Sequence, residues 1–248
     1  MINPTNQVVV VTGASSGIGA ELGRAFSRQG ARVVLIARRF ERLKTVSQDC
    51  SGEVLIVTAD LTKDAERKSA VQKTMERWGD IDILVNNAGM GMYGHFSDST
   101  QSDWRRIFEI NLFSAVFLTQ LVLPIMQARK KGLIINMASI GGLIAHSDNV
   151  SPYVASKHAL VGFSRGLARD VADDEIRVLA VCPHLTRTEF FKASPGAEEM
   201  APLVKKYKQF MDTPADVAQG ILDQLNSDQL VVFPTQKPAM AYQKQRDV

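Results

Sequence analysis

Seven short apolar runs recur along the chain, and longer segments with helical spacing separate them. Each run is apolar at nearly every position, which is the pattern of a strand covered on both faces. The runs are Val8–Thr12, Val33–Ala37, Val54–Ala59, Ile83–Asn86, Leu133–Met137, Arg177–Val181 and Leu230–Phe233. Strands of this kind that alternate with helices predict an α/β fold, with a doubly wound, seven-stranded parallel sheet and helices on both faces.

One domain is expected over the 248 residues, because no linker, charge block or internal repeat interrupts the alternation. A chain of this length can bury a substantial core without disulfides. The 29 basic and 26 acidic residues leave a formal net charge of +3, and no basic tract dominates. The charge therefore does not favour nucleic acid as a partner.

The two cysteines, Cys50 and Cys182, lack the spacing of a metal site or a disulfide framework, which favours a reducing, cytoplasmic location. His95, His146 and His158 share no metal-ligand spacing, so no metal is expected. The first apolar run is too short for a signal peptide or a membrane span.

Two long helices are predicted, over Ser102–Lys130 and Ser151–Val171. In the second, Ser151 is the expected N-cap and Pro152 the first helical residue. Both segments are apolar around much of their circumference. This pattern fits either a surface buried against something beyond the sheet or a wide stripe that faces the core.

A glycine-rich loop, Thr12-Gly13-Ala14-Ser15-Ser16-Gly17-Ile18-Gly19, follows the first run and leads directly into a helix. Glycines let the backbone approach a pyrophosphate closely, and the N–H groups at the helix start face its phosphates. The strand–loop–helix context favours a dinucleotide-binding loop over a plain tight turn. The residues expected to contact the cofactor here are Gly13, Ser15, Ser16, Gly17, Ile18 and Gly19.

Two arginines, Arg38 and Arg39, end the second strand. Dinucleotide folds that take NAD place an acid here for the ribose 2′-hydroxyl, whereas arginine suits a 2′-phosphate. This favours NADP(H) over NAD, although a solvated arginine pair at a helix start gives the same pattern. After the third strand, Asp60 and Leu61 either frame the adenine or, through Thr62, cap the strand end.

A second group of polar residues lies at the ends of later strands. The fourth strand runs into Asn87-Ala88-Gly89, and the fifth ends at Ser139. Tyr153 and Lys157 lie four residues apart and therefore on one face of the next helix. Alone, such a pair is typical of an exposed amphipathic helix. In an open parallel sheet, however, ligands bind beyond the carboxyl ends of the strands, which brings these residues to the cofactor loop.

Taken in order and spacing, these motifs resemble those of the single-domain short-chain dehydrogenase/reductases. The matching residues are Thr12, Gly13, Gly17, Gly19, Asn86, Asn87, Ala88, Gly89, Asn111, Ser139, Tyr153 and Lys157. The resemblance covers essentially the whole chain. It implies a Rossmann fold, a nicotinamide cofactor, and hydride transfer at a carbonyl or alcohol carbon.

The resemblance also implies a role for each catalytic residue. Tyr153 is the general acid in reduction, and its phenol pKa, about 10 when free, must fall to work near neutrality. Lys157 and the oxidised nicotinamide favour the phenolate, and Lys157 also binds the nicotinamide ribose. Ser139 orients the substrate oxygen. Asn111 helps to hold a water that joins Lys157 to a proton relay.

After the sixth strand, Pro183, Thr186 and Thr188 complete the cofactor-binding set that the resemblance implies. Here the chain departs from the family, which has Pro-Gly where this sequence has Pro183-His184. Histidine enters the left-handed region less easily than glycine. Either the turn survives with the ring in solvent, or the imidazole projects toward the cofactor or substrate and narrows the site.

Residues 187–213, rich in Phe, Met and Leu, are expected to form a substrate lid. They indicate an apolar substrate, although packing within the lid explains the same residues. The resemblance further implies a homodimer or homotetramer built on the two long helices. The function predicted is an NADP(H)-dependent carbonyl reductase. The alternatives are an NAD-dependent alcohol dehydrogenase that works oxidatively and a non-catalytic nucleotide-binding regulator.

Overall fold

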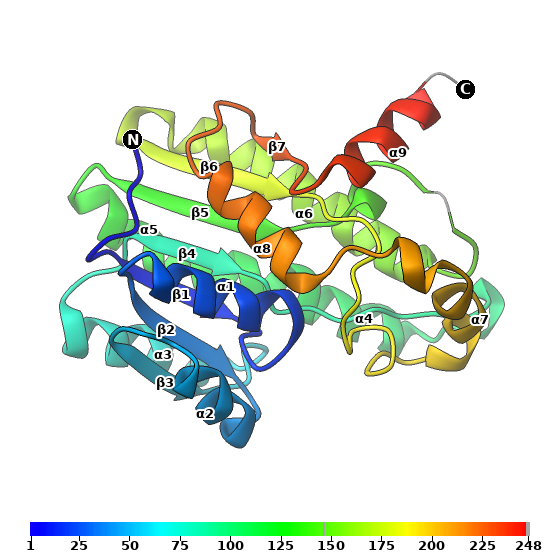
Figure 1. Cartoon of the computed structure of the whole chain (residues 1–248), viewed down its shortest axis with the longest axis horizontal. Helices are drawn as coiled ribbons and strands as arrows, with labels where there is room; N and C mark the ends of the chain where they lie inside the picture. Colours follow the sequence, from blue (N-terminus) through cyan, green and yellow to red (C-terminus); the bar gives the residue numbers. More distant parts are fainter. Residues whose placement is uncertain (146, 247–248) are drawn as a thin grey trace.

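Within residues 1–145 and 147–246, which the computed structural model describes, seven parallel strands form one sheet with the order β3-β2-β1-β4-β5-β6-β7 (Figure 1). The strands are β1 Val8–Thr12, β2 Arg32–Ala37, β3 Val54–Thr58, β4 Ile83–Asn86, β5 Gly132–Met137, β6 Ile176–Val181 and β7 Val231–Val232. The predicted fold is confirmed. The strand order reverses between β1 and β4, which creates a crevice at their carboxyl ends.

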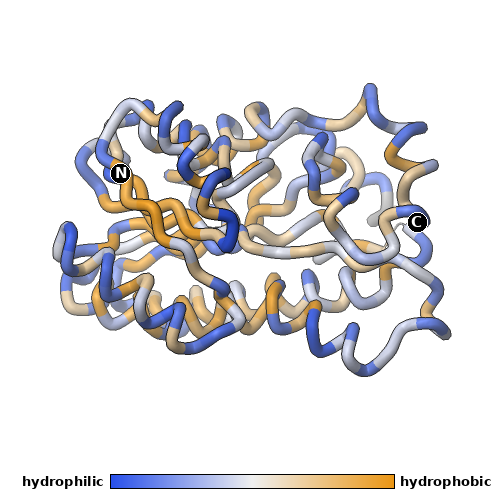
Figure 2. Tube along the Cα trace, turned by 90° about the horizontal axis from the view of Figure 1, so that it is seen from below, coloured by the Kyte–Doolittle hydropathy of each residue, from blue (hydrophilic) through white to orange (hydrophobic). Residues whose placement is uncertain are grey.

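Helices cover both faces of the sheet, and successive residues of β1 serve opposite cores. Val9 and Val11 pack toward α1 (Gly17–Arg28), α2 (Phe40–Gln48) and α8 (Pro214–Asp223). Val8 and Val10 pack toward α3 (Asp64–Trp78), α5 (Ser114–Ala128) and α6 (Ser151–Asp170). Figure 2 shows the resulting sandwich, in which hydrophobic strands lie between two layers of helices. Burial on both faces explains why the runs are apolar at nearly every position.

The predicted helix over 102–130 forms as a continuous helical stretch with a π-helical turn inside it. α4 (Gln101–Phe108) begins with a capping box between Thr100 and Asp103, and α5 ends the stretch. Between them, Glu109–Phe113 forms the π turn η2. The 28-residue stretch from Gln101 to Ala128 is long and apolar enough to cross a membrane, judged by length and composition alone, and 39% of its most apolar window is buried in the protein.

The start of α6 differs from the sequence prediction by one residue. Val150, not Ser151, occupies the N-cap, and it has no capping side chain. Ser151 and Pro152 are the first two helical residues. Proline fits there because N–H groups in the first turn have no partner within the helix.

The segment between β6 and α8 leaves the sheet and returns to nearly the same point. Thr186 and Asp212 form a bridge, with Arg187 N donating to Asp212 O at 2.9 Å and Asp212 N to Leu185 O at 3.0 Å. Between these ends lie α7 (Ala197–Tyr207) and the short η5 (Lys208–Phe210), beyond the carboxyl ends of the strands (Figure 1). The remaining elements are η1 (Phe96–Asp98), η3 (Ile140–Gly142), η4 (Ala172–Asp174) and α9 (Gln236–Arg246).

Candidate active site

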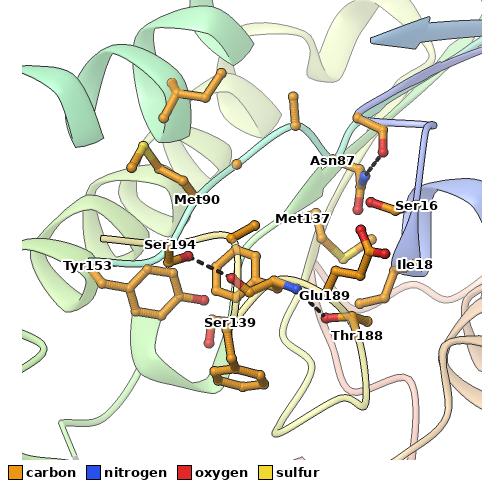
Figure 3. A pocket seen from close by; sticks show the side chains of 18 of the residues that line it. Ser16, Ile18, Asn87, Met90, Met137, Ser139, Tyr153, Thr188, Glu189 and Ser194 are labelled. Atoms are coloured by element: carbon orange, nitrogen blue, oxygen red, sulfur yellow. Dashed lines mark hydrogen bonds between the residues drawn. The ribbon is translucent and has the colours of Figure 1, made fainter. Parts of the chain in front are cut away.

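A cavity of about 660 Å³ lies at the carboxyl ends of the strands and extends from the glycine-rich loop to the 187–211 segment (Figure 3). Most of the predicted site residues line it. These are Gly13, Ser15, Ser16, Gly17, Ile18, Arg38, Arg39, Asp60, Leu61, Asn87, Ala88, Gly89, Ser139, Tyr153, Lys157, Pro183, Thr186 and Thr188. Gly19 and Asn111 lie behind the wall instead.

Close packing between the glycine-rich loop and the end of β4 shapes one side of the cavity. A Cβ on Gly19 would lie 2.4 Å from Asn87 Nδ2 and 2.5 Å from Gly13 O. Asn87 Nδ2 donates to Thr12 O at 2.8 Å, while Asn87 N and Ala88 N donate to the Thr12 hydroxyl at 2.8 and 2.9 Å. Asn87 thus fixes the loop, and the space above the glycines fits a pyrophosphate.

The β2 end of the cavity is cationic. Arg39 donates through Nη2 to the hydroxyls of Ser15 and Ser16, at 2.9 and 2.8 Å. Exposed Arg38 lines the same space. This charge suits an anionic group of a bound ligand.

Asp60 carries the contacts expected of a strand-end cap. Its Oδ1 accepts from Thr62 N at 3.1 Å and from the Thr62 hydroxyl at 2.8 Å. Asp60 and Leu61 also line the cavity, so the cap leaves both residues accessible from it.

Ser139, Tyr153 and Lys157 meet at the other end of the cavity, where Figure 3 shows Ser139 next to Tyr153. Ser139 occupies the N-cap of η3, and its hydroxyl accepts from Gly141 N at 3.1 Å. Tyr153 and Lys157 lie one turn apart on α6. Lys157 Nζ donates to Met137 O at 2.8 Å and lies 5.9 Å from the centre of the Tyr153 ring. The strand end and the helix together hold the three polar groups.

Burial has the largest effect on the pKa values of Tyr153 and Lys157. It raises the pKa of Tyr153 to about 12, against the opposing effect of a hydrogen bond with Ser139. It lowers the pKa of Lys157 to about 8. The chain's own groups therefore do not produce the lowered tyrosine pKa that the sequence led us to expect, and the cationic oxidised nicotinamide would have to supply the missing charge.

Asn111 lies in the π turn and fixes the backbone beside Gly89. Its Oδ1 accepts from Met90 N at 2.8 Å, and its Nδ2 donates to Met90 O at 2.9 Å and to Ser156 Oγ at 3.0 Å. A Cβ on Gly89 would lie 3.1 Å from Asn111 Oδ1 and 3.6 Å from Lys157 Nζ. Asn111 thus approaches Lys157 from behind the cavity wall, and the backbone is its direct partner.

The loop after β6 accommodates histidine without the left-handed conformation. His184 is not among the non-glycine residues of the described chain with positive φ, so the turn imposes no strain of that kind. It is partly exposed and lines the cavity. Farther along, Thr188 packs against Gly17, whose Cβ would lie 3.1 Å from its methyl group.

Gly91 and Tyr93, which the sequence did not single out, complete the site by their contacts with the predicted lid. Gly91 N donates to Ser194 Oγ at 2.8 Å, and Tyr93 N donates to Pro195 O at 3.0 Å, which fastens the loop after β4 to the 187–211 segment. The Tyr93 side chain is buried, which raises its pKa, and its ring stacks on Phe191 at 6.3 Å. These contacts belong to no short motif, since they join positions about 100 residues apart.

The same segment forms an apolar wall beside the reacting end. The Phe190 ring meets the Tyr153 ring edge-on, with centres 5.8 Å apart. Tyr93, Val150 and Met200 form a buried cluster against which Phe190 and Phe191 pack. A substrate that reaches Tyr153 therefore lies against aromatic and aliphatic surface.

Known proteins resemble this chain in sequence and fold. A family model described as short chain dehydrogenase matches residues 7–199. The human "Dehydrogenase/reductase SDR family member 7" is 38% identical over 202 residues, which make up 78% of this chain and 59% of that protein. An "Uncharacterized oxidoreductase" of Thermotoga maritima is 36% identical over 206 residues, covering 80% of this chain and 81% of its own.

A solved structure extends the similarity to nearly the whole fold. The short-chain dehydrogenase from Streptomyces avermitilis matches with a TM-score of 0.87 and 30% identity, covering 99% of this chain and 94% of that one. This chain spans less than two thirds of the human relative but most of both bacterial proteins. It belongs to the short-chain dehydrogenase/reductase family of NAD(P)-dependent oxidoreductases.

Proposed function

We propose that this protein is an NADP(H)-dependent carbonyl reductase. It would transfer hydride between the nicotinamide and a carbonyl or secondary alcohol carbon. The observation that carries this proposal is the meeting of Ser139, Tyr153 and Lys157 at one end of a cavity whose other end is a glycine-rich loop. A nucleotide-binding regulator has no use for a phenol beside an ammonium, which argues against a non-catalytic role.

In reduction, the Ser139 hydroxyl binds the substrate oxygen and directs it toward the Tyr153 hydroxyl. Tyr153 gives its proton to that oxygen as the carbon is reduced, and Lys157 holds the nicotinamide ribose and stabilises the resulting phenolate. Asn111 keeps the Met90 backbone, and with it the cavity wall at Gly89, in place. The bound nicotinamide supplies the hydride.

The cofactor preference is proposed to depend on Arg38, with help from Arg39 and Ser15. Hydrogen bonds to charged groups contribute about 1.5–3 kcal/mol each. Arg38→Asp should therefore weaken NADPH binding at least about tenfold. Equal affinity of the wild-type protein for NADH and NADPH would instead support the alternative, an NAD-dependent alcohol dehydrogenase.

The substrate is proposed to be a small apolar carbonyl compound, since Phe190, Phe191 and Met200 line the cavity beside Tyr153. The 187–213 segment would act as its lid. The decisive experiment is an assay of NADPH oxidation across a panel of apolar and polar ketones and aldehydes. Turnover that favours the apolar compounds supports both the reductase function and the apolar substrate. No turnover with any compound counts against a reductase.

We further propose a cytoplasmic homo-oligomer. Most of the apolar window of the stretch Gln101–Ala128 is only partly buried within one chain, and Phe113 is 39% exposed. A second copy that packs on this face would bury it. Cell fractionation that places the protein in the membrane pellet would favour a lipid environment for the same face.

A further inference from the structure

An acidic residue of the lid, Glu189, reaches the cationic end of the cofactor cavity. Its carboxylate pairs with Arg42, 147 positions earlier in the chain, and lies 3.5 Å from Arg39 Nη1. Figure 3 places Glu189 on the side of Ser16 and Ile18, away from Tyr153. An anion from a distant segment thus occupies the cationic end of the cavity.

The chemistry of this contact resembles that expected for a phosphate. Arg39 is already bonded to the hydroxyls of Ser15 and Ser16, so its guanidinium is oriented toward the cavity. A carboxylate shared by two guanidiniums uses the donors that a phosphate monoester would use. Arg42 also holds the pKa of Glu189 below its usual value, so the carboxylate is charged at neutral pH.

The nearest acid along the sequence does not take this role. Glu41 lies in the first turn of α2, directly before Arg42, yet it forms no ion pair within residues 1–145 and 147–246. The counter-ion of Arg39 and Arg42 comes from the lid. Proximity in sequence therefore does not explain the contact.

We propose that Glu189 is a specificity-determining residue, an internal anion that competes with the 2′-phosphate of the cofactor for Arg39 and Arg42. The inference rests on the proposed preference for NADP(H) and adds a residue that limits it. Arg39 lines the cavity, whereas Arg42 lies beside it, in a hollow that shares Ser15, Ser16 and Gly17 with the cavity. A 2′-phosphate must displace the carboxylate before it gains both guanidiniums. A cofactor with a free 2′-hydroxyl leaves the pair intact.

The expected size of the effect of Glu189 on 2′-phosphate binding follows from the exposure of the three charged side chains. The side chains of Arg39, Arg42 and Glu189 are 45%, 46% and 53% exposed, so solvent screens the pair. Exposed ion pairs contribute little individually. Removing the competing charge should therefore strengthen binding of a 2′-phosphate by about three- to tenfold, an amount consistent with a screened contact.

The experiment uses adenosine fragments, which report on this end of the cavity alone. Calorimetry should compare 2′,5′-ADP and 5′-AMP binding to the wild-type protein and to Glu189→Gln. We expect the substitution to tighten 2′,5′-ADP at least about threefold and to leave 5′-AMP unchanged, which also verifies that the variant is folded. Glu41→Gln is the matched control, because it removes the same charge next to Arg42 without breaking the pair.

A second set of variants tests whether the effect of Glu189→Gln on 2′,5′-ADP binding depends on Arg39 and Arg42. In a variant that carries Arg39→Gln and Arg42→Gln, the further change Glu189→Gln should no longer tighten 2′,5′-ADP. The proposal is overturned if Glu189→Gln leaves 2′,5′-ADP affinity unchanged or weaker, if both fragments tighten equally, or if Glu41→Gln has the same effect.

The two proposals fail in different ways. If the wild-type protein does not prefer 2′,5′-ADP over 5′-AMP but Glu189→Gln does, the NADP(H) preference is wrong and the role of Glu189 stands. If the wild-type protein prefers 2′,5′-ADP and Glu189→Gln does not increase the preference, only the role of Glu189 is wrong. If neither protein prefers it, both are wrong.

Discussion

Burial acts in opposite senses on the two titratable groups beside the reacting end. It raises the pKa of Tyr153 to about 12 and lowers that of Lys157 to about 8. At neutral pH the phenol therefore keeps its proton, as a donor for reduction must, while Lys157 keeps most of its charge.

The role of Tyr153 can be tested by removing one oxygen. Tyr153→Phe should keep the fold and bind NADPH, because the ring still packs against Phe190. It should lose about 10²–10⁴ in kcat, the usual contribution of general acid catalysis. Tyr207→Phe, at an exposed position on α7, is the matched control. A Tyr153→Phe enzyme within a factor of about three of wild type, when chemistry is rate-limiting, contradicts the role.

Cofactor affinity should depend on pH through Lys157. Below its pKa of about 8 the ammonium is present, and as pH rises beyond that value the charge and its ribose contact are lost. The Kd for NADPH should then rise by up to about tenfold per pH unit. The Kd for NADPH at each pH can be measured by titration, with the nicotinamide fluorescence as the signal.

Two controls separate Lys157 from other groups. Lys157→Met should bind NADPH more weakly and with no rise in Kd above pH 8. The fragment 2′,5′-ADP, which lacks the nicotinamide ribose, should show no such dependence with the wild-type protein. A pH-independent Kd for NADPH in the wild-type protein between pH 7 and 10 would contradict the assignment.

At the scale of the element, the π turn is the feature that most affects the site. A π turn accommodates one residue more than an α-helical turn. If Glu109–Phe113 were α-helical, every side chain after it would be rotated about the helix axis by one residue. The π turn instead directs Asn111 at the Met90 backbone and Ser156. A local irregularity of α4–α5 thereby supports the loop that follows β4.

Asn111→Ala should therefore act through the backbone. It leaves the partly buried N–H and C=O of Met90 without their partner, and each unsatisfied group costs up to about 1–3 kcal/mol. The free energy of unfolding should fall by about 2–4 kcal/mol in urea titration, with a lower kcat. Ser156→Ala removes a single bond of Asn111 and should cost less. An Asn111→Ala protein as stable as wild type would show that the turn does not depend on these bonds.

The limits of prediction from sequence also lie at this scale. Strands buried on both faces carry an unmistakable run of Val, Ile and Leu, so β1 to β7 and their carboxyl-end residues could be predicted. The π turn could not, because the same residues suit an α-helix and tertiary bonds of Asn111 decide between the two. The pair of Glu189 and Arg42 could not either, because the two residues are brought together only by the fold and no motif links them.

For the whole molecule, the proposed sites for cofactor and substrate fall on different parts of the chain. The strand ends and the glycine-rich loop form the cofactor end, while the segment from Phe190 to Met211 covers the reacting end. The two parts meet at Thr188 and Glu189. In the proposed arrangement, a ligand at the glycine-rich loop would therefore contact the first residues of the segment that covers the reacting end.

Assembly is the prediction that belongs to this scale. Light scattering at micromolar concentration should give the mass of a dimer or tetramer. Phe113→Asp should shift it to the monomer, because the charge would be buried in the interface, while Met240→Asp, at an exposed position of α9, should not. Circular dichroism should confirm that both variants are folded. A monomeric wild-type protein would rule the interface out.

The bridge between Thr186 and Asp212 has an evolutionary consequence. Since both ends of the intervening loop depart from one fixed pair, the number of residues between them does not alter the path of β6 or α8. Loop closure entropy also rises slowly, by about 0.6 kcal/mol for each doubling of length. Insertions, deletions and exchange of the part of the loop after Glu189 can thus change the wall beside Tyr153, while the sheet and the residues at the glycine-rich loop stay unchanged.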